Sequence, residues 1–280
     1  NRRHGDPWTV GEGVFVLTPQ EVESLGLSDG ERRILRPYHR PCEIGRYYLA
    51  ERPSRWLIHS TAETCPDVSA FPAIERHLAR FRPILEARRE TREGRRPWWQ
   101  LHWPRDEALW TADKVLSVQM ARRPAFAAAT RPVHVNFSVN VFVPDARTRE
   151  HLLYLTAVLN SEPLWRWFDR HAKRRGVGLE INGQVLARAP IRRIDFADAG
   201  ERRWHDELVD LARRMHRPTV HANEEDRRGE EACIDEIDRR IDQLACRLYG
   251  LPDASPTTTD LRPAWARPAV GPFPPDRPCQ

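Results

Sequence analysis

Residues 134–168 read HVNFSVNVFVPDARTREHLLYLTAVLNSEPLWRWF, and the hydrophobic period changes within this stretch. At its start apolar and polar residues alternate, which predicts a half-buried strand. One face of that strand would carry Val135, Phe137, Val139 and Val141, and the other Asn136, Ser138 and Asn140. From Leu152 onward the apolar spacing is that of an amphipathic helix, which should stop near Asn160 and resume as a short turn after Pro163. A strand followed by a helix favours a mixed α+β domain of short β-sheets with flanking helices.

The chain before this stretch also alternates between short strands and helices. GEGVFVLT (11–18), RWLIHS (55–60) and DKVLSVQM (113–120) read as strands. An acidic helical piece follows the first of them. Next comes ILRPYHRPCEIGRYYL (34–49), in which Pro37 and Pro41 forbid a long helix. We therefore expect a loop that displays arginines and tyrosines.

A helix is predicted over 71–92, because Ile74, Leu78, Phe81 and Leu85 recur at helical spacing. Pro83 interrupts this pattern, so the helix should bend or restart there. The tryptophan-rich stretch PWWQLHWPRDEALW (97–110) indicates core anchoring. Stacking of these rings on bases or sugars is the alternative that the sequence leaves open.

The C-terminal third is predicted to be helical between a basic loop and a tail. RHAKRRGVGLEING (170–183) reads as a glycine-containing basic loop, and 217–231 as a polar break between two helices. In the last helix Ile234, Ile237, Ile241, Leu244 and Leu248 form an apolar stripe, with Gly250 placed to end it. Residues 252–280 are rich in proline and lack periodicity, so we expect a disordered tail.

Charge is distributed unevenly over the chain, whose formal net charge is +5. Residues 1–200 carry 32 basic and 24 acidic groups, whereas 201–251 carry 10 basic and 13 acidic groups. Clustered guanidinium groups neutralise phosphates and an acidic segment repels them. A polyanionic partner, if there is one, should therefore meet the first part; an ordinary mixed-charge surface is the competing interpretation.

Several classes of function find no support in the residues. No apolar run approaches the roughly 18 residues that a membrane span needs. Five scattered cysteines without a CxxC pair favour neither a disulfide scaffold nor a zinc site, and they fit a reducing, cytoplasmic compartment. Glycine-rich phosphate loops, GxSxG, HExxH and the Asn-Pro-Pro-aromatic loop of adenine methyltransferases are missing as well. We expect no catalytic residue, cofactor site or metal site in this chain.

Seven segments in order resemble the TaqI-like C-terminal specificity domain of N6-adenine DNA methyltransferases, including the Eco57I-like restriction-modification methylases. The most specific match is FPAIERHLARFRPILEARRE followed by RRPWWQL (71–101). Before it stand GEGVFVLT and ILRPYHRPCEIGRY, and after it DKVLSVQM, VNFSVNVFVPD and LTAVLNSEPLWRWF. The closing helix EIDRRIDQLACRLYGL is the seventh. The resemblance covers about residues 11–251.

This resemblance implies sequence-specific recognition of double-stranded DNA, with S-adenosylmethionine held by a catalytic domain upstream, in the same chain or in another subunit. Arginine suits phosphates and guanine edges, and asparagine suits adenine edges. The DNA-contact candidates are therefore Arg36, Arg40, Arg46, Lys114, Arg122, Arg123, Asn136, Asn140, Lys173, Arg174 and Arg175. A free-standing DNA-binding specificity subunit and an RNA-binding module that stacks bases on its tryptophans are the rival hypotheses.

These expectations divide the chain into four segments. Residues 1–10 would end an upstream region or linker, 11–200 would form the DNA target-recognition domain, 201–251 the helical closing segment and 252–280 the disordered tail.

Overall fold

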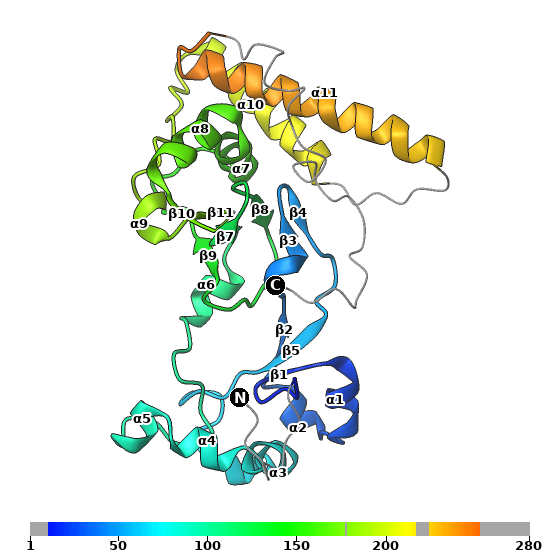
Figure 1. Cartoon of the computed structure of the whole chain (residues 1–280), viewed down its shortest axis with the longest axis vertical. Helices are drawn as coiled ribbons and strands as arrows, with labels where there is room; N and C mark the ends of the chain where they lie inside the picture. Colours follow the sequence, from blue (N-terminus) through cyan, green and yellow to red (C-terminus); the bar gives the residue numbers. More distant parts are fainter. Residues whose placement is uncertain (1–10, 177, 217–223, 253–280) are drawn as a thin grey trace. The chain divides into compact units, whose positions relative to one another are not determined.

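The computed structural model describes residues 11–176, 178–216 and 224–252, with side chains from 232 onward in the last range. It is a mixed α+β structure with small antiparallel sheets, as the sequence predicts. The chain forms two compact units (Figure 1). Of the described residues, unit 1 contains 11–40, 52–110 and 132–134, and unit 2 contains 41–51, 111–131, 135–176, 178–216 and 224–252. The predicted recognition segment 11–200 thus contributes to both units, and the predicted tail from 253 on lies outside the described residues.

Unit 1 is built on a three-stranded antiparallel sheet in the order β1-β5-β2. Its elements are β1 (Val16–Leu17), α1 (Pro19–Ser24), α2 (Asp29–Arg32), β2 (Leu35–Tyr38), β5 (Arg55–Ile58), the 3-10 turn η2 (Val68–Ala70), α3 (Pro72–Ala79), α4 (Arg82–Glu86), α5 (Arg89–Arg92) and α6 (Glu107–Thr111). The strands expected at 11–18 and 55–60 are confirmed. The loop expected over 34–49 is partly wrong, since β2 pairs Leu35 with Ile58. Pro37 is tolerated there because β2 is an edge strand.

Short capped helices close unit 1. Thr18 and Ser28 each form a capping box, and their partners Glu21 and Glu31 stand three residues later. Glu31 is buried and also accepts hydrogen bonds from the backbone N–H groups of Ala73 and Ile74, at 2.7 and 3.2 Å. One carboxylate therefore caps the first turns of both α2 and α3.

The helical region 71–92 breaks as the sequence predicts. α3 ends at Ala79, and α4 starts again with Pro83 in its first turn, where a missing N–H costs nothing. Ile74, Leu78 and Phe81 are buried in the core of unit 1 together with Leu17. Trp56, Trp98 and Trp99 pack against this core. Of the tryptophan-rich stretch, Trp98 and Trp99 thus have the anchoring role, Trp110 is buried as well, and Trp103 is exposed.

Unit 2 combines small sheets with helices. Its elements are η1 (Pro41–Glu43), β3 (Ile44–Gly45), β4 (Tyr48–Leu49), β6 (Lys114–Val118), β7 (Met120–Ala121), β8 (Phe126–Ala129), β9 (Val139–Phe142), α7 (Leu152–Asn160), α8 (Glu162–His171), β10 (Lys173–Arg175), β11 (Gly178–Glu180), α9 (Gly183–Leu186), α10 (Ala199–Met215) and α11 (Glu224–Leu248). The sheets run β8-β6-β9, β10-β11-β7 and β3-β4, all antiparallel.

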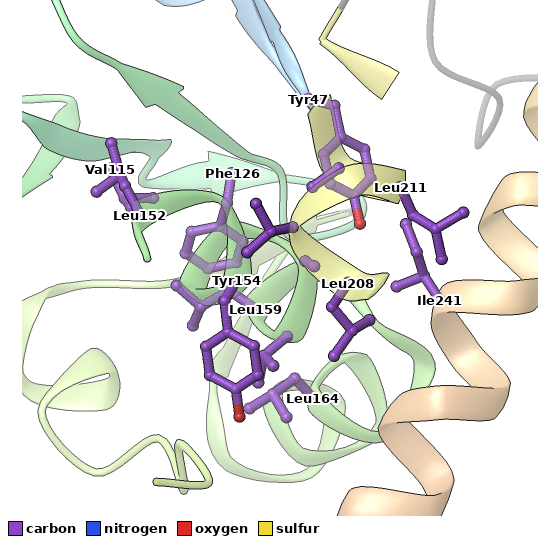
Figure 2. Close-up of a cluster of buried hydrophobic side chains, with 14 of the residues drawn as sticks. Tyr47, Val115, Phe126, Leu152, Tyr154, Leu159, Leu164, Leu208, Leu211 and Ile241 are labelled. Atoms are coloured by element: carbon purple, nitrogen blue, oxygen red, sulfur yellow. The ribbon is translucent and has the colours of Figure 1, made fainter. Parts of the chain in front are cut away.

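The core of unit 2 lies where α7 meets the β8-β6-β9 sheet and the helices α10 and α11 (Figure 2). Phe126 and Val115 enter it from the sheet, Tyr154 and Leu159 from α7, and Leu208 from α10. The predicted strand at 113–120 and the helix stop at Asn160 are confirmed. α7 ends at Asn160 because the next residue, Ser161, takes an extended backbone conformation with a ψ of 159°. The Asn160 side chain pairs with the backbone N–H and C=O of Phe126, at 3.0 and 2.8 Å.

The closing helix α11 follows the predicted apolar stripe. Ile237, Ile241, Leu244 and Leu248 are buried, and Gly250 takes a φ of 62° just after the helix. The polar break predicted up to 231 is wrong from Glu224 on, where α11 already begins. Glutamate and arginine are good helix formers, and nothing in that stretch forbids the extension.

The strand expected from the alternation at 134–144 is shorter than predicted. Only Val139–Phe142 is a strand, because the chain turns at Asn136–Val139. As a result Phe137 is exposed and Asn140 is buried, the reverse of the expected faces. The predicted loop 170–183 is also partly wrong, since β10 and β11 form a hairpin within it.

No helix among the described residues is long and apolar enough to cross a membrane.

Candidate nucleic-acid interface

The basic stretch at 173–175 lies on a sheet. Lys173, Arg174 and Arg175 form β10, which pairs with β11, and β11 pairs with β7. Gly178 favours this arrangement, because a Cβ at that position would stand 3.0 Å from the carbonyl oxygen of Ala121, closer than most side chains come to a backbone oxygen. The close approach brings the hairpin beside Arg122, which follows β7 directly. We name these four exposed cations, Arg122, Lys173, Arg174 and Arg175, the basic sheet edge.

The ion pairs of the basic sheet edge are weak. Arg174 contacts Asp169 at 2.5 Å and Arg175 contacts Glu180, and both arginine side chains are more than half exposed. Exposed ion pairs contribute about 0–1 kcal/mol, so these arginines can exchange their carboxylates for a phosphate at little cost. The edge therefore offers accessible positive charge on a hydrogen-bonded support.

Arg123, next to Arg122, is held differently. Its guanidinium lies 3.4 Å from Glu162 and 5.2 Å from the centre of the Trp165 ring, and its side chain is largely buried. Glu162 also binds Arg166, at 3.0 Å. Of the two neighbouring arginines, only Arg122 is on the surface.

Arg46 belongs to the core, and this burial is incompatible with the predicted DNA contact. It stands at the tip of the β3-β4 hairpin, beside Tyr47, whose φ of 56° is unusual for a residue with a side chain. The guanidinium is buried, pairs with the buried Asp238 of α11 and donates to the backbone carbonyl of Asn160 at 2.9 Å. Burial alone would lower the pKa of Arg46, but Asp238, Tyr47 and Asp242 together outweigh this effect and raise the pKa. Arg46 thus joins the hairpin tip to α7 and α11.

Lys114 is also buried, in β6, so it cannot reach DNA in this structure. Its ammonium group donates to the backbone carbonyls of Ala112 and Arg131, at 2.7 and 3.2 Å. Burial lowers the pKa of Lys114 to about 8. No local pattern indicates this burial, because lysines are mostly exposed.

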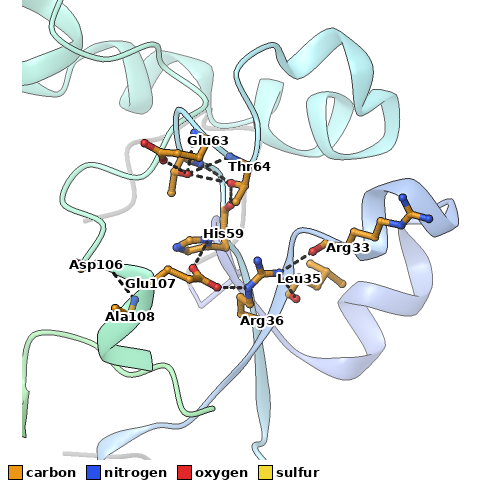
Figure 3. Close-up of polar contacts among 10 residues, drawn as sticks. Arg33, Leu35, Arg36, His59, Glu63, Thr64, Asp106, Glu107 and Ala108 are labelled. Carbon is orange, nitrogen blue, oxygen red and sulfur yellow. Dashed lines mark hydrogen bonds and ion pairs between the residues drawn. The ribbon is translucent and has the colours of Figure 1, made fainter. Parts of the chain in front are cut away.

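Arg36 is engaged in contacts within unit 1 (Figure 3). Its guanidinium bonds the carboxylate of Glu107 at 3.1 Å and the carbonyl of Arg33 at 2.6 Å. Glu107 in turn lies 3.4 Å from His59, whose pKa is lowered by burial and by Arg36 despite that carboxylate. Arg36 therefore ties β2 to α6. Arg40 lies in unit 1 and is partly exposed.

The two asparagines are occupied in the turn and sheet of unit 2. The Asn136 side chain accepts from the backbone N–H of Ser138 at 3.0 Å. Asn140 is buried, accepts from Gln119 at 3.3 Å and donates to the carbonyl of Ile181 at 2.7 Å. Asn140 is therefore a structural bridge rather than a group that can read adenine.

The geometry thus sorts the eleven predicted contact residues. Four lie together on the basic sheet edge, Arg40 and Asn136 are partly exposed elsewhere, and the remaining five side chains stabilise the fold. These five are Arg36, Arg46, Lys114, Arg123 and Asn140.

Among the described residues, no group of three or more His, Cys, Asp or Glu side chains is placed to hold a metal ion. The chemistry that the edge supports is binding of an anionic surface.

Comparison with known proteins places the chain near restriction-modification methyltransferases. It is 24% identical over 125 residues to the type II methyltransferase M.HincII of Haemophilus influenzae and 25% identical over 125 residues to M.HindII of Haemophilus influenzae (strain ATCC 51907 / DSM 11121 / KW20 / Rd). Each match covers 42% of this chain, and about a quarter of the relative. No family model matches the sequence.

The fold is similar to part of MmeI, a type IIL restriction-modification enzyme whose structure was solved in complex with DNA. The TM-score is 0.62 at 13% sequence identity, over 87% of this chain and 32% of that one. This chain therefore spans about a third of the length of MmeI and shares the fold of that part.

Proposed function

We propose that this chain recognises duplex DNA as the specificity part of a restriction-modification methyltransferase. The observation that carries the proposal is the basic sheet edge, where a hydrogen-bonded sheet holds four exposed cations and the ion pairs of Arg174 and Arg175 are open to solvent. The similarity of its fold to part of a DNA-bound restriction-modification enzyme supports the same conclusion. Phosphate contacts of this kind position a protein on DNA.

We further propose that the parent enzyme methylates adenine at N6 and that the recognition part is TaqI-like. The support is the order of the seven segments quoted above. Flipping a base costs a few kcal/mol of unstacking, which contacts to the undisturbed duplex can offset. In this division of labour a domain upstream holds S-adenosylmethionine. Calorimetric titration tests this assignment, because saturable micromolar binding of S-adenosylmethionine by this chain would contradict it.

The DNA proposal is tested by replacing Lys173, Arg174 and Arg175 with alanine and measuring duplex affinity at several salt concentrations. Removal of one phosphate-binding cation should reduce the slope of log affinity against log salt by about 0.9. Random and target duplexes should weaken about equally, because phosphates carry no sequence information.

The matched control removes three exposed arginines from α10 of the same unit, Arg202, Arg203 and Arg213. It lowers the net charge equally but leaves the basic sheet edge intact, so the salt slope should stay close to that of the unchanged chain. Equal salt slopes for the unchanged chain, the hairpin variant and the α10 control would show that the β10-β11 hairpin does not contact DNA. Tighter binding of single-stranded RNA than of duplex DNA in competition would favour the RNA-binding hypothesis instead.

A further inference from the structure

Two large apolar side chains are exposed beside the basic sheet edge. Phe137 is 58% exposed and Met120 is 48% exposed. Met120 lies in β7 opposite Glu180 of β11, and Phe137 lies in the turn before β9. Gln119 precedes Met120 and Ser138 follows Phe137. The backbone N–H of Gln119 donates to the carbonyl of Ser138 at 2.8 Å, which joins the segment of Met120 to the turn of Phe137. Phe137 and Met120 are therefore exposed on two segments of unit 2 that a backbone hydrogen bond joins.

The turn that presents Phe137 is held in place by hydrogen bonds. The Asn136 side chain accepts from Ser138, and the N–H of Val139 donates to the Asn136 carbonyl at 3.2 Å, which closes the turn around Phe137. Phe137 is thus at the tip of a β-turn instead of within the predicted strand. Presenting its ring costs little further backbone entropy.

A second set of bonds fixes this turn to the basic sheet edge. Gln119 donates to the side chain of Asn140, Asn140 donates to the carbonyl of Ile181, and the N–H of Ile181 donates to the carbonyl of Gln119 at 2.8 Å. Ile181 directly follows β11. The apolar pair and the cations of the hairpin therefore sit on one interlocked piece of unit 2, which includes β7, β9 and β11 (Figure 1).

Singly exposed apolar residues are common, but a phenylalanine and a methionine on segments joined to the basic sheet edge have a specific chemical match. A duplex offers phosphates to the cations and, between them, apolar base faces. Phenylalanine and methionine are side chains that DNA-bending proteins insert between base steps. Building on the proposed function, we propose that Phe137 inserts between neighbouring base pairs of duplex DNA, with Met120 packed beside it, while the basic sheet edge holds the flanking phosphates.

Insertion of this kind requires unstacking, so it should be easier where stacking is already weak. The test compares two 25-bp duplexes of the same mixed sequence, one fully paired and one with a single central mismatch, in competition for the full chain. We expect the mismatched duplex to be preferred by about tenfold, equivalent to about 1.4 kcal/mol. Phe137→Ala should bind both duplexes equally, and Met120→Ala should show a reduced preference.

Two further variants separate insertion from a general loss of structure. Phe137→Trp keeps an aromatic ring and should keep the preference for the mismatch. Leu251→Ala removes an apolar side chain of similar exposure just after α11 and should behave as the unchanged chain does. The melting temperature of every variant should lie within about 2 °C of that of the unchanged chain, because the substituted side chains are on the surface.

The outcomes distinguish this inference from the function on which it rests. A preference for the mismatch that disappears in Phe137→Ala and persists in Phe137→Trp supports insertion. Binding of both duplexes with equal affinity by the unchanged chain, or an unchanged preference in Phe137→Ala, overturns the insertion and leaves DNA recognition standing. Failure to bind either duplex overturns the proposed function and the insertion together.

Discussion

Breaking the buried pair between Arg46 and Asp238 should destabilise unit 2 more than removal of any exposed ion pair. Both side chains are less than a tenth exposed, and the guanidinium also satisfies the Asn160 carbonyl. Arg46→Met would remove the guanidinium group that neutralises the buried Asp238 carboxylate, and breaking a buried pair in this way typically costs about 3–5 kcal/mol. At roughly 2–4 °C per kcal/mol for a domain of this size class, the melting temperature should fall by about 6–20 °C.

The assay is urea unfolding followed by circular dichroism at 222 nm, with tryptophan emission as a second probe because the chain has two units. The double variant Arg46→Met/Asp238→Leu removes both charges, so it should recover at least half of the stability that Arg46→Met removes. Arg213→Met, at an exposed pair with Asp210, is the matched control and should cost less than about 0.5 kcal/mol. A destabilisation below about 1 kcal/mol in Arg46→Met, or a double variant no more stable than Arg46→Met, would refute the reasoning.

Three other outcomes are expected. Lys114 has a pKa of about 8 when folded, below its value of 10.5 in the unfolded chain, so the unfolded state binds more protons between these values. Stability should therefore rise from about pH 8 to 10.5, and Lys114→Met should lack this rise in a series of urea titrations. Glu31→Ala removes the acceptor of four backbone and hydroxyl donors and should cost about 2–3 kcal/mol, seen as earlier thermal unfolding of unit 1, whereas Glu86→Ala at an exposed pair should cost almost nothing. Truncation after Leu251 should leave the melting temperature unchanged, and a clear fall would show that the removed residues stabilise the described part.

Local sequence patterns predicted the elements that repeat their apolar spacing over several turns and those whose ends are marked by particular residues. The stripe of α11 and the restart at Pro83 follow from apolar spacing and ring geometry. The stop at Asn160 is followed at once by the extended Ser161 and by Pro163, which stands in the first turn of α8. The strand predicted from the alternation at 134–144 was too long, because the Asn136 side chain bonds the backbone of Ser138 and stabilises a turn in place of the strand. Alternation of apolar and polar residues does not show where strand pairing begins. The hairpin at 173–180 was missed for a related reason: its three basic residues have no apolar face.

The candidate interface, too, was predicted only in part from the sequence, and the tertiary structure decided the rest. The sequence determined the α+β class, the basic character of 173–175 and the similarity to restriction-modification methyltransferases, because these depend on composition and order. Only the tertiary structure decided which cations are on the surface. Arg46 and Arg122 look alike in the sequence, yet Arg46 meets a carboxylate 192 residues away and is buried, while Arg122 is exposed. Burial of a charge depends on a partner that the fold brings from far along the chain, and no local pattern contains that partner.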